Sequence, residues 1–411
     1  MAGRDPHEEH RVATPLELLF DLCFVIAFSA AANELAHAVA VGHIAAGIGG
    51  FAFAAFGAFW AWLQWTWFAS AYDTDDWIYR LLTLVQMVGV LVFTLGLPAM
   101  FASMDQGGHL DNRVMVLGYV VMRVPMVLQW LRAAAQDPVR RRQHNYYVVT
   151  IVLSQIVWCV LAVVDLSLRA TLLFMIVPMT LELAGPVLAE TKAHGTMTPW
   201  HPHHIAERYG LLVIIALGEG LLGTTTSLAA VVGPQGPGWS WDVAGLGVSG
   251  VAMAFGMWWL YFGIRFGDFL HAHRDRGFGF GYGHYVVLAA LVAVGAGLHV
   301  AAYYYQREST LGELGTLAAV AIPLTIFIVA IYAVFSLVTR SIDPYHAGVL
   351  AGTILVIVAG LALAAAGVSL VVSLLVLTLA PWISVIAYER HGHDFQQQVL
   401  ASTSEPPGVR G

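Results

Sequence analysis

The sequence has 411 residues, of which 58% are hydrophobic and only 11% charged, with thirteen Trp and a single Lys. A soluble domain of this size carries roughly a quarter charged residues, so the composition excludes a soluble protein. It indicates an integral membrane protein whose main partner is the lipid bilayer. The formal net charge of −7 is spread over loops and ends without a basic patch, which excludes nucleic acid as a partner.

Apolar runs of about twenty residues, the length that crosses a bilayer as a helix, predict twelve transmembrane helices. In chain order they lie near 15–37, 44–71, 77–101, 110–132, 145–165, 168–190, 204–228, 241–266, 282–305, 314–339, 345–366 and 367–388. A membrane barrel would instead alternate over about ten residues. The predicted fold class is therefore all-α, a polytopic membrane helical bundle. The first run is too long and too acidic for a cleaved signal peptide.

Basic residues predict the orientation of these helices, because cytoplasmic loops are enriched in Lys and Arg. The side that carries both ends of the chain holds Arg4, Arg11, Arg132, Arg140, Arg141, Arg142, Lys192, Arg265, Arg274, Arg276, Arg340, Arg390 and Arg410. The opposite side holds only Arg113, Arg169 and Arg307. Both termini are therefore predicted to be cytoplasmic, as an even number of spans requires.

A weak internal similarity suggests two halves. "AFGAFWAWL" at 55–63 resembles "AFGMWWL" at 254–260, and an acidic, apolar span precedes each. We predict six-helix halves at 15–190 and 204–390, related as parallel repeats. A cytoplasmic tail (1–14), a connection (191–203) and a second tail (391–411) complete the chain. The alternative is that Ala, Phe, Gly and Trp recur through composition alone.

Four segments carry a resemblance to a known family. They are "TPLELLFDLCFVIAF" from Thr14, "DTDDWIYRLLTLVQM" (73–87), "HIAERYGLLVIIALGEGLL" (204–222), and "WWLYF" (258–262) followed by "YGHY" (282–285), which contains His284. In this order they resemble the bacterial low temperature requirement A family of multispanning membrane proteins. The resemblance implies a multi-pass protein of the bacterial cytoplasmic membrane and supplies no biochemical activity.

A fainter likeness connects helix 1 with the lysosomal potassium channel family, which has two six-helix repeats and a Phe-Ser-Asp motif on the first helix of each. Here Phe20-Asp21 stands in helix 1, but the seventh span has "YGLL" at the matching place. A shared pore is not implied by this partial match, and the likeness is an analogy of architecture.

Two acids one helical turn apart stand out in the first span. Thr14-Pro15-Leu16-Glu17 has the pattern of a capping box with Pro at the first helical position, so capping alone explains Glu17. Asp21 lies roughly 9 Å from the start of the helix, beyond the reach of a cap. A carboxylate in the hydrocarbon costs about 3 kcal/mol and usually has a partner inside the bundle.

Partners for Asp21 can be sought by depth along the helices. Arg123 and Glu182 lie nine and eight residues from the predicted cytoplasmic ends of their spans, roughly 12–14 Å deep. We therefore predict a charged layer of Asp21, Arg123 and Glu182, in which Asp21 is coupled to Arg123. Its alternative interpretation is an ion triad that only fixes helix packing.

The seventh span adds another intramembrane acid. Glu219 lies between Gly218 and Gly220, twelve residues after Glu207 and eleven after Arg208, and no Arg or Lys is expected at its depth. Burial favours the neutral form of a carboxyl, so Glu219 is a candidate proton carrier. A hydrogen-bonded structural Glu is the alternative.

On the cytoplasmic side we predict a second motif, made of Glu17, Asp73, Asp76, Arg80, Glu207, Arg208 and His284. Part of it lies in the turn before the third span. Asp73 and Asp76 precede Arg80, and Asp76 with Arg80 forms an i,i+4 pair. We predict a helix cap and a surface pair, with a gate contact to Arg208 or to the 274–276 loop as the alternative. The aromatic run "FWAWLQWTWF" from Phe59 is expected to lie mostly at the interfaces and against lipid.

No cofactor or metal site is expected. His194, His201, His203 and His204 cluster around Pro202, but no second group completes a ligand shell, although a loop histidine could sense pH. Cys23 and Cys159 fall inside spans without metal or disulfide spacing. No phosphate-binding loop, dinucleotide motif or nucleophile elbow is present.

These observations leave three functional hypotheses. The predicted spans contain five candidate intramembrane acids but only two Arg. This surplus of acids favours a secondary transporter or an ion-conducting protein. Its substrate would be an unidentified small solute or a cation, protons included. A structural or regulatory membrane protein without transport is the alternative. A membrane-embedded enzyme acting on lipid or quinone ranks below both, because no catalytic residues are identified, and we predict that the protein is not an enzyme.

Overall fold

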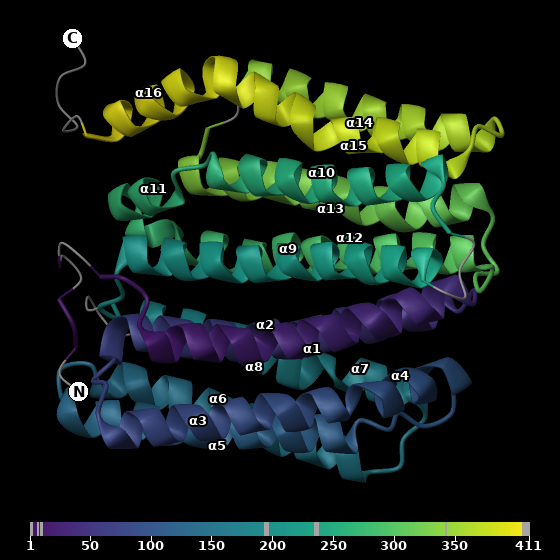
Figure 1. Cartoon of the computed structure of the whole chain (residues 1–411). Helices are drawn as coiled ribbons and strands as arrows, with labels where there is room; N and C mark the ends of the chain where they lie inside the picture. The colour runs from purple at the N-terminus through teal and green to yellow at the C-terminus, as the bar shows by residue number, and fades with distance from the viewer. Residues whose placement is uncertain are drawn as a thin grey trace. The chain divides into compact units, whose positions relative to one another are not determined.

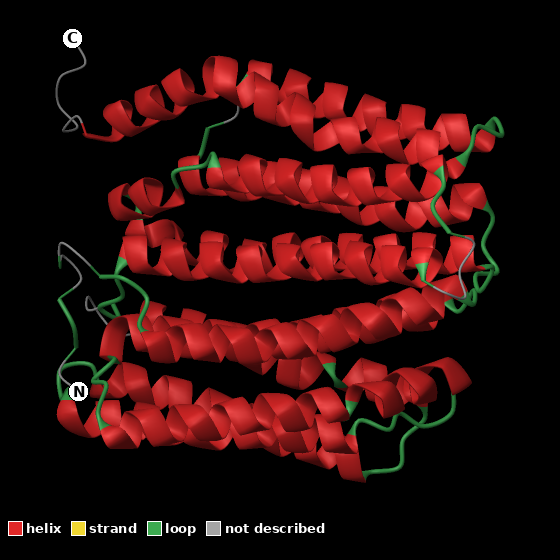
Figure 2. Cartoon of the chain, viewed as in Figure 1, coloured by secondary structure: helices red, strands yellow, loops and turns green. Residues whose placement is uncertain are grey.

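The computed structural model describes residues 3–5, 8, 11–192, 197–233, 238–341 and 343–404. Helices make up almost all of the described chain, whose only β-type pairing is an isolated bridge between His109 and Ser167 (Figure 2). The chain divides into two compact units, Met1–Glu34 with Ala45–Arg208, and Leu35–Ile44 with Tyr209–Gly411. The division falls inside helices α1 and α9.

Figure 1 labels the helices in chain order. Those from the N-terminus through the first unit are α1 (Pro15–Ala40), α2 (Ile44–Tyr72), α3 (Trp77–Leu95), α4 (Leu97–Gln106), α5 (Arg113–Gln136), α6 (Arg141–Val163), α7 (Leu168–Phe174) and α8 (Ile176–Thr191). Within this unit α3 packs against α5, α5 against α6, and α6 against α8.

Helix α9 (Pro202–Val232) leads into the second unit. The remaining elements are α10 (Trp241–Phe262), α11 (Phe266–Ala272), η1 (Arg274–Arg276), α12 (Gly277–Gln306), α13 (Glu313–Thr339), α14 (Pro344–Ala365), α15 (Leu370–Ala387), the π-helical turn η2 (Tyr388–Gly392) and α16 (His393–Ser404). Here α12 packs against α13, α14 against α15, and α10 against α15.

Eleven segments of the described chain are long and apolar enough to cross a membrane, and α9 is a further helix of 31 residues. The predicted all-α, polytopic membrane bundle is confirmed. The similarity between the two halves and their parallel relation stay predictions. Helix α16 occupies part of the segment that was expected to be a tail.

Close helix approach in the first unit depends on small residues. A Cβ added at Gly118 of α5 would lie 2.1 Å from the backbone nitrogen of Phe93 in α3, and one at Gly89 would lie 2.7 Å from the backbone nitrogen of Met122. Only glycine permits this backbone contact, as is typical of membrane helix pairs. The α3–α5 pair therefore helps to hold the helices that carry the buried polar groups described below.

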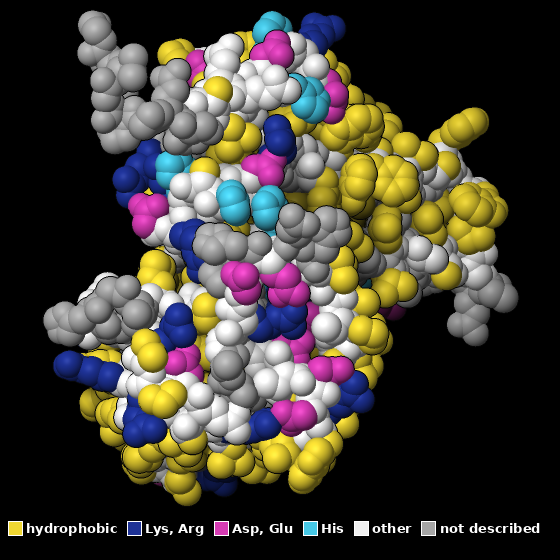
Figure 3. Space-filling view, turned by 90° about the vertical axis from the view of Figure 1, so that its left-hand side faces the viewer, with side chains coloured by type: hydrophobic (Ala, Val, Ile, Leu, Met, Phe, Trp, Pro, Cys, Tyr) yellow, Lys and Arg dark blue, Asp and Glu magenta, His cyan; other side chains and the backbone are white. Residues whose placement is uncertain are grey.

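Charged side chains concentrate at the helix ends. Figure 3 looks onto the helix ends on the side of the N-terminus, where Lys, Arg, Asp, Glu and His side chains gather among the loops. Hydrophobic side chains lie along the edges of this view. This distribution is the one expected for helices whose middles contact lipid.

Candidate functional site

The start of α1 is a capping box, as the sequence predicts. The backbone nitrogen of Thr14 donates to Glu17 Oε2 at 2.7 Å, and the backbone nitrogen of Glu17 donates to Thr14 Oγ1 at 3.3 Å. Capping is only part of the role of Glu17, because its side chain is fully buried. A buried carboxylate requires charged partners as well as backbone donors.

Those partners come from the start of α9, which begins at Pro202, two residues before the predicted start. His204 Nε2 lies 3.1 Å from Glu17 Oε1, and Arg208 Nη1 lies 3.2 Å from the same oxygen. Arg208 Nη2 lies 2.5 Å from Asp21 Oδ1, and this pair is also buried. The two acids of α1 thus meet two basic side chains that are spaced equally, four residues apart, on α9.

Helix α2 surrounds this pair with aromatic rings. Trp62 Nε1 donates to Asp21 Oδ1 at 2.6 Å. The Arg208 guanidinium carbon lies 6.0 Å from the ring centroid of Trp62 and 5.4 Å from that of Trp65, within the range of cation–π attraction. Phe20 stacks on Trp65 at 3.8 Å between ring centroids. Arg11 belongs to the same group, since its Nη2 lies 3.5 Å from Glu17 Oε1. We call this group the Arg208 cluster; its members are Arg11, Glu17, Asp21, Trp62, His204 and Arg208.

The predicted coupling of Asp21 to Arg123 is wrong, because Asp21 pairs with Arg208 and Arg123 pairs with Glu182 at 2.8 Å. Depth along a helix places a residue in a layer but does not say which helix face it occupies or which helix is its neighbour. Arg208 was assigned to the cytoplasmic edge because the predicted α9 started too late.

Glu182 of α8 is the centre of a second buried group. Its carboxylate accepts hydrogen bonds from six side chains at 2.8–3.2 Å: Trp60, Gln64, Tyr119, Arg123, Ser154 and Gln155. We call these seven residues the Glu182 cluster. The donors come from α2, α5 and α6, so one carboxylate ties four helices of the first unit together.

The expectation that the aromatic run of α2 faces lipid is wrong for its central residues. Trp60, Trp62 and Trp65 are at most 1% exposed. Trp60 and Gln64, one helical turn apart, face Glu182, whereas Trp62 points to Asp21. Residues two apart on a helix lie on different faces, so α2 supplies donors to both clusters.

Among the described residues, both clusters hold buried polar atoms that lack a hydrogen-bond partner; in the Glu182 cluster these are Gln64 Oε1, Arg123 Nε and Gln155 Oε1. The clusters differ in their carboxylates. Both oxygens of Glu182 accept several hydrogen bonds. Within the part of the chain that the structure describes, Asp21 Oδ2, Arg11 Nε and Nη1, and the hydroxyl of neighbouring Tyr79 are buried without a hydrogen-bond partner. Such atoms usually contact water or an ion. In the Arg208 cluster one of these atoms is a carboxylate oxygen, Asp21 Oδ2.

The acidic turn before α3 lies next to this cluster but pairs differently from the prediction. Asp76 caps α3 through the backbone nitrogens of Ile78 and Tyr79, which confirms the predicted cap. Its ion-pair partner is Arg132 of α5 at 2.5 Å, while Arg80 pairs with Asp75 at 2.6 Å. The predicted pair of Asp76 with Arg80 is therefore wrong.

Asp73 is the acid of this turn that belongs with the buried charges, since it is 8% exposed. Burial raises the pKa of Asp73, the Glu17 carboxylate raises it further, and the hydrogen bond from the Asp75 backbone nitrogen opposes both. In contrast, the hydrogen bond from Arg132 lowers the pKa of Asp76. Asp73 is thus the loop carboxyl that most readily holds a proton.

Replacing Asp73 by Asn should therefore change how stability depends on pH. A raised pKa means that the folded protein binds this proton more tightly than the unfolded chain, so the contribution of Asp73 is present at low pH and is lost as pH rises through the raised value. Asn keeps the oxygen that accepts from Asp75. We expect Asp73→Asn to raise the melting temperature at neutral pH by about 2–4 °C, the shift that about 1 kcal/mol gives in a unit of this size.

Thermal melts of purified protein between pH 4 and pH 8 measure this effect. The difference in melting temperature between Asp73→Asn and wild type should disappear at the acidic end of this range. Asp75→Asn is the matched control, because the hydrogen bond from Arg80 lowers the pKa of Asp75 and its effect should have the opposite sign. A difference between Asp73→Asn and wild type that is constant over pH would contradict the assignment.

The other predicted residues lie elsewhere. Glu207 is exposed on the first turns of α9. Glu219, 3% exposed, lies further along α9 in the second unit, where the neighbouring Gly220 approaches Gly295 of α12 closely. His284 of α12 is fully buried, its Nδ1 lying 2.7 Å from the Phe280 carbonyl oxygen and its Nε2 3.0 Å from the Tyr261 hydroxyl.

The histidine segment before α9 serves the first unit. His201 Nε2 lies 2.7 Å from the Glu8 carbonyl oxygen, and His204 contacts Glu17. His194 lies outside the described residues. Within the described ranges, no group of three or more His, Cys, Asp or Glu side chains is arranged to hold a metal.

Comparison with known proteins points to one family. A model described as "Bacterial low temperature requirement A protein (LtrA)" matches residues 12–381, which contain both clusters except for Arg11. The chain is also similar to "Uncharacterized protein RA0937" of Rhizobium meliloti (strain 1021), at 28% identity over 261 residues. That match covers 60% of this chain and 57% of the relative. No solved structure matches the chain.

Proposed function

The chain belongs to the bacterial low temperature requirement A family of membrane proteins, and we propose that it acts as a secondary transporter or ion-conducting protein. In this proposal the Arg208 cluster is its proton- or cation-linked element. The protein lies in the bacterial cytoplasmic membrane with both termini in the cytoplasm, because basic residues concentrate on that side of the sequence.

The charge balance of the Arg208 cluster, taken together with neighbouring Asp73, supports the proposal. Two guanidinium groups, Arg11 and Arg208, lie near three carboxyls, Glu17, Asp21 and Asp73. The group is neutral only when it holds one more positive charge, which a proton on Asp73 or a bound cation would supply. Because burying an uncompensated charge is costly, uptake and release of that charge would be coupled to rearrangement of the cluster.

Flux measurements on purified protein test the proposal. Proteoliposomes with an internal pH dye are placed under an imposed pH gradient, and Na⁺, K⁺, amino acids and cationic drugs are added in turn. We expect at least one of them to change the rate at which the gradient dissipates, relative to protein-free liposomes. Identical rates for all additions would count against transport.

Glu219 supplies the sharpest single-residue test of proton linkage in the second unit. Glu219 is a buried carboxyl between Gly218 and Gly220, and a carboxyl can exist with or without its proton. Glu219→Gln mimics the neutral state, so we expect normal folding and insertion but a loss of pH-driven flux of about tenfold or more, as for removal of a proton-transfer group.

Thermal stability and pH-gradient flux should be measured on the same Glu219→Gln preparation. Glu207→Gln is the matched control, because it removes a carboxylate from the same helix at an exposed position, and its flux should stay near that of wild type. Unchanged flux in Glu219→Gln would remove Glu219 from the proton pathway.

The Glu182 cluster favours a second candidate function, a structural or regulatory membrane protein without transport. Six donors from α2, α5 and α6 bind the Glu182 carboxylate of α8, which fixes helix positions and leaves little freedom for movement. The flux assay separates the candidates. We also propose that the protein is not an enzyme, since neither cluster places a nucleophile beside a general base.

A further inference from the structure

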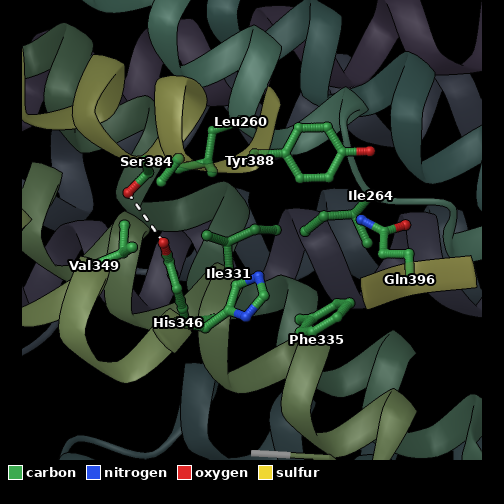
Figure 4. Close-up of a pocket in the computed structure, with 11 residues that line it drawn as sticks. Leu260, Ile264, Ile331, Phe335, His346, Val349, Ser384, Tyr388 and Gln396 are labelled. Carbon is green, nitrogen blue, oxygen red and sulfur yellow. Dashed lines mark hydrogen bonds between the residues drawn. The ribbon is translucent and has the colours of Figure 1, made fainter. Parts of the chain in front are cut away.

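The second unit contains two adjoining cavities at the junction of α13, α14 and α16. One, of about 40 Å³, lies mainly among α10, α13 and α15, and the other, of about 230 Å³, lies between α13 and α14. Tyr332, Phe335 and His346 line both cavities. We call the combined space the His346 groove. Figure 4 shows the rings of Phe335, His346 and Tyr388 around the smaller cavity.

An Asp–His pair provides the polar chemistry of the groove. His346 Nδ1 lies 2.8 Å from Asp343 Oδ2. The hydrogen bond from His346 lowers the pKa of Asp343, so the group is a carboxylate at neutral pH and can only accept. The imidazole must therefore carry its proton on Nδ1, which leaves Nε2 of the neutral ring as an acceptor.

The rest of the lining is aromatic and aliphatic. Phe335, Phe395, Tyr332 and Tyr388 contribute rings, whose faces attract cations. The Tyr332 hydroxyl is already used, because it donates to Ser384 Oγ at 3.1 Å. Among the described residues that line the groove, Asp343 is the only acid and there is no Lys or Arg. The groove is therefore complementary to a positive charge on an apolar body.

The wall at Tyr388 is held in place by the backbone. Tyr388 begins the π-helical turn η2, a feature often found at functional sites. A Cβ added at Gly392 would meet its ring at 2.3 Å, and one at Gly263 would meet it at 2.8 Å. The ring is thus enclosed between two glycines, and this side of the groove is formed before a ligand binds.

From this geometry we propose that the His346 groove binds a primary ammonium group carried on an aliphatic chain. The ammonium donates a hydrogen bond to His346 Nε2, and its charge is balanced by Asp343. The chain lies against Phe335, Tyr332 and the aliphatic lining. A free lipophilic amine and the headgroup of phosphatidylethanolamine share this chemistry. The site is separate from the Arg208 cluster and does not rest on the proposed transport function.

Equilibrium binding of radiolabelled n-octylamine to the full-length protein in phosphatidylcholine nanodiscs tests the site, with empty nanodiscs subtracted. Asp343 Oδ1 caps α14 by accepting a hydrogen bond from the Tyr345 backbone nitrogen at 3.3 Å. Asp343→Asn keeps an oxygen for this cap but removes the negative charge. We expect it to weaken octylamine binding at least tenfold. Octan-1-ol, which lacks the charge, should compete at least tenfold less well than the unlabelled amine.

Asp275→Asn is the matched control, because Asp275 is an exposed acid of the same unit that pairs with Arg340 and does not line the groove. Its affinity should stay within twofold of wild type. Ala347→Phe, at an exposed position that lines the larger cavity, should fill the space and abolish binding without lowering the melting temperature. Equal binding by wild type and Asp343→Asn, or no binding above empty nanodiscs, would overturn the proposal.

The source of the ammonium group is distinguished in the same assay. When phosphatidylethanolamine replaces part of the phosphatidylcholine, a loss of octylamine binding assigns the groove to this lipid headgroup. Unchanged binding assigns it to free lipophilic amines.

Discussion

Arg208→Gln is expected to destabilise the first unit by about 3–5 kcal/mol, the cost of leaving buried charges without their partner. Arg208 contacts both Glu17 and Asp21, and all three side chains are almost completely buried. Without the guanidinium, two carboxylates would face each other in an apolar interior. The yield of monodisperse protein on size-exclusion chromatography and its melting temperature should both fall sharply.

A double-mutant cycle shows whether this loss comes from the pair. Adding Asp21→Asn to Arg208→Gln removes the carboxylate whose ion-pair partner was Arg208 and should recover part of the stability, with a coupling energy of about 1–3 kcal/mol. Adding Asp21→Asn to Arg123→Gln should give additive losses, because Arg123 belongs to the other cluster. Additive losses for Asp21 with Arg208 would refute the pairing.

Glu182→Gln is the second large expected loss, also about 3–5 kcal/mol. The amide nitrogen would replace an acceptor with a donor among six donors, and Arg123 would remain buried without its counter-charge. Buried donors left without acceptors add their own cost. Thermal or denaturant unfolding of the purified variant measures the loss.

Asp165→Asn is a suitable control for Glu182→Gln. It also neutralises an acid of the first unit, but its side chain is 90% exposed, so the change should stay within about 0.5 kcal/mol. A similar small change for Glu182→Gln would mean that its carboxylate does not hold the four helices together.

The sequence predicted the membrane bundle well because apolar length is a strong signal. Each predicted span corresponds to a long helix or to a helix with a short break, such as α7 and α8 around Met175. The Thr14–Glu17 capping box was also predicted correctly, since it depends only on neighbouring residues. Breaks inside spans were missed because they depend on local packing more than on composition.

The charge pairing was harder to predict because it depends on where each helix begins. Both α1 and α9 start with a proline, at Pro15 and Pro202. Counted from these prolines, Glu17 matches His204 and Asp21 matches Arg208. Because proline is common at the first helical position, both helix starts, and with them the alignment of the two acids with the two basic residues, could have been predicted from the sequence. A start placed two residues late moved Arg208 out of the layer of Asp21.

The aromatic run of α2 was misassigned for a different reason. Trp is enriched at membrane interfaces, but the indole N–H also suits a buried carboxylate, and composition does not distinguish these uses. Trp60 and Trp62 each donate to an acid on another helix. Intramembrane acids therefore provide a reason to assign nearby Trp residues to the interior.

Proton-linked flux through the Arg208 cluster is tested most directly by one comparison in proteoliposomes. The Asp21→Asn, Arg208→Gln double variant removes one buried pair, so it can be compared with wild type once its fold is verified. With any addition that alters pH-gradient dissipation in wild type, the double variant should show no effect above protein-free liposomes. Equal rates in wild type and the folded double variant would contradict a role of this cluster in transport and leave it a structural ion pair.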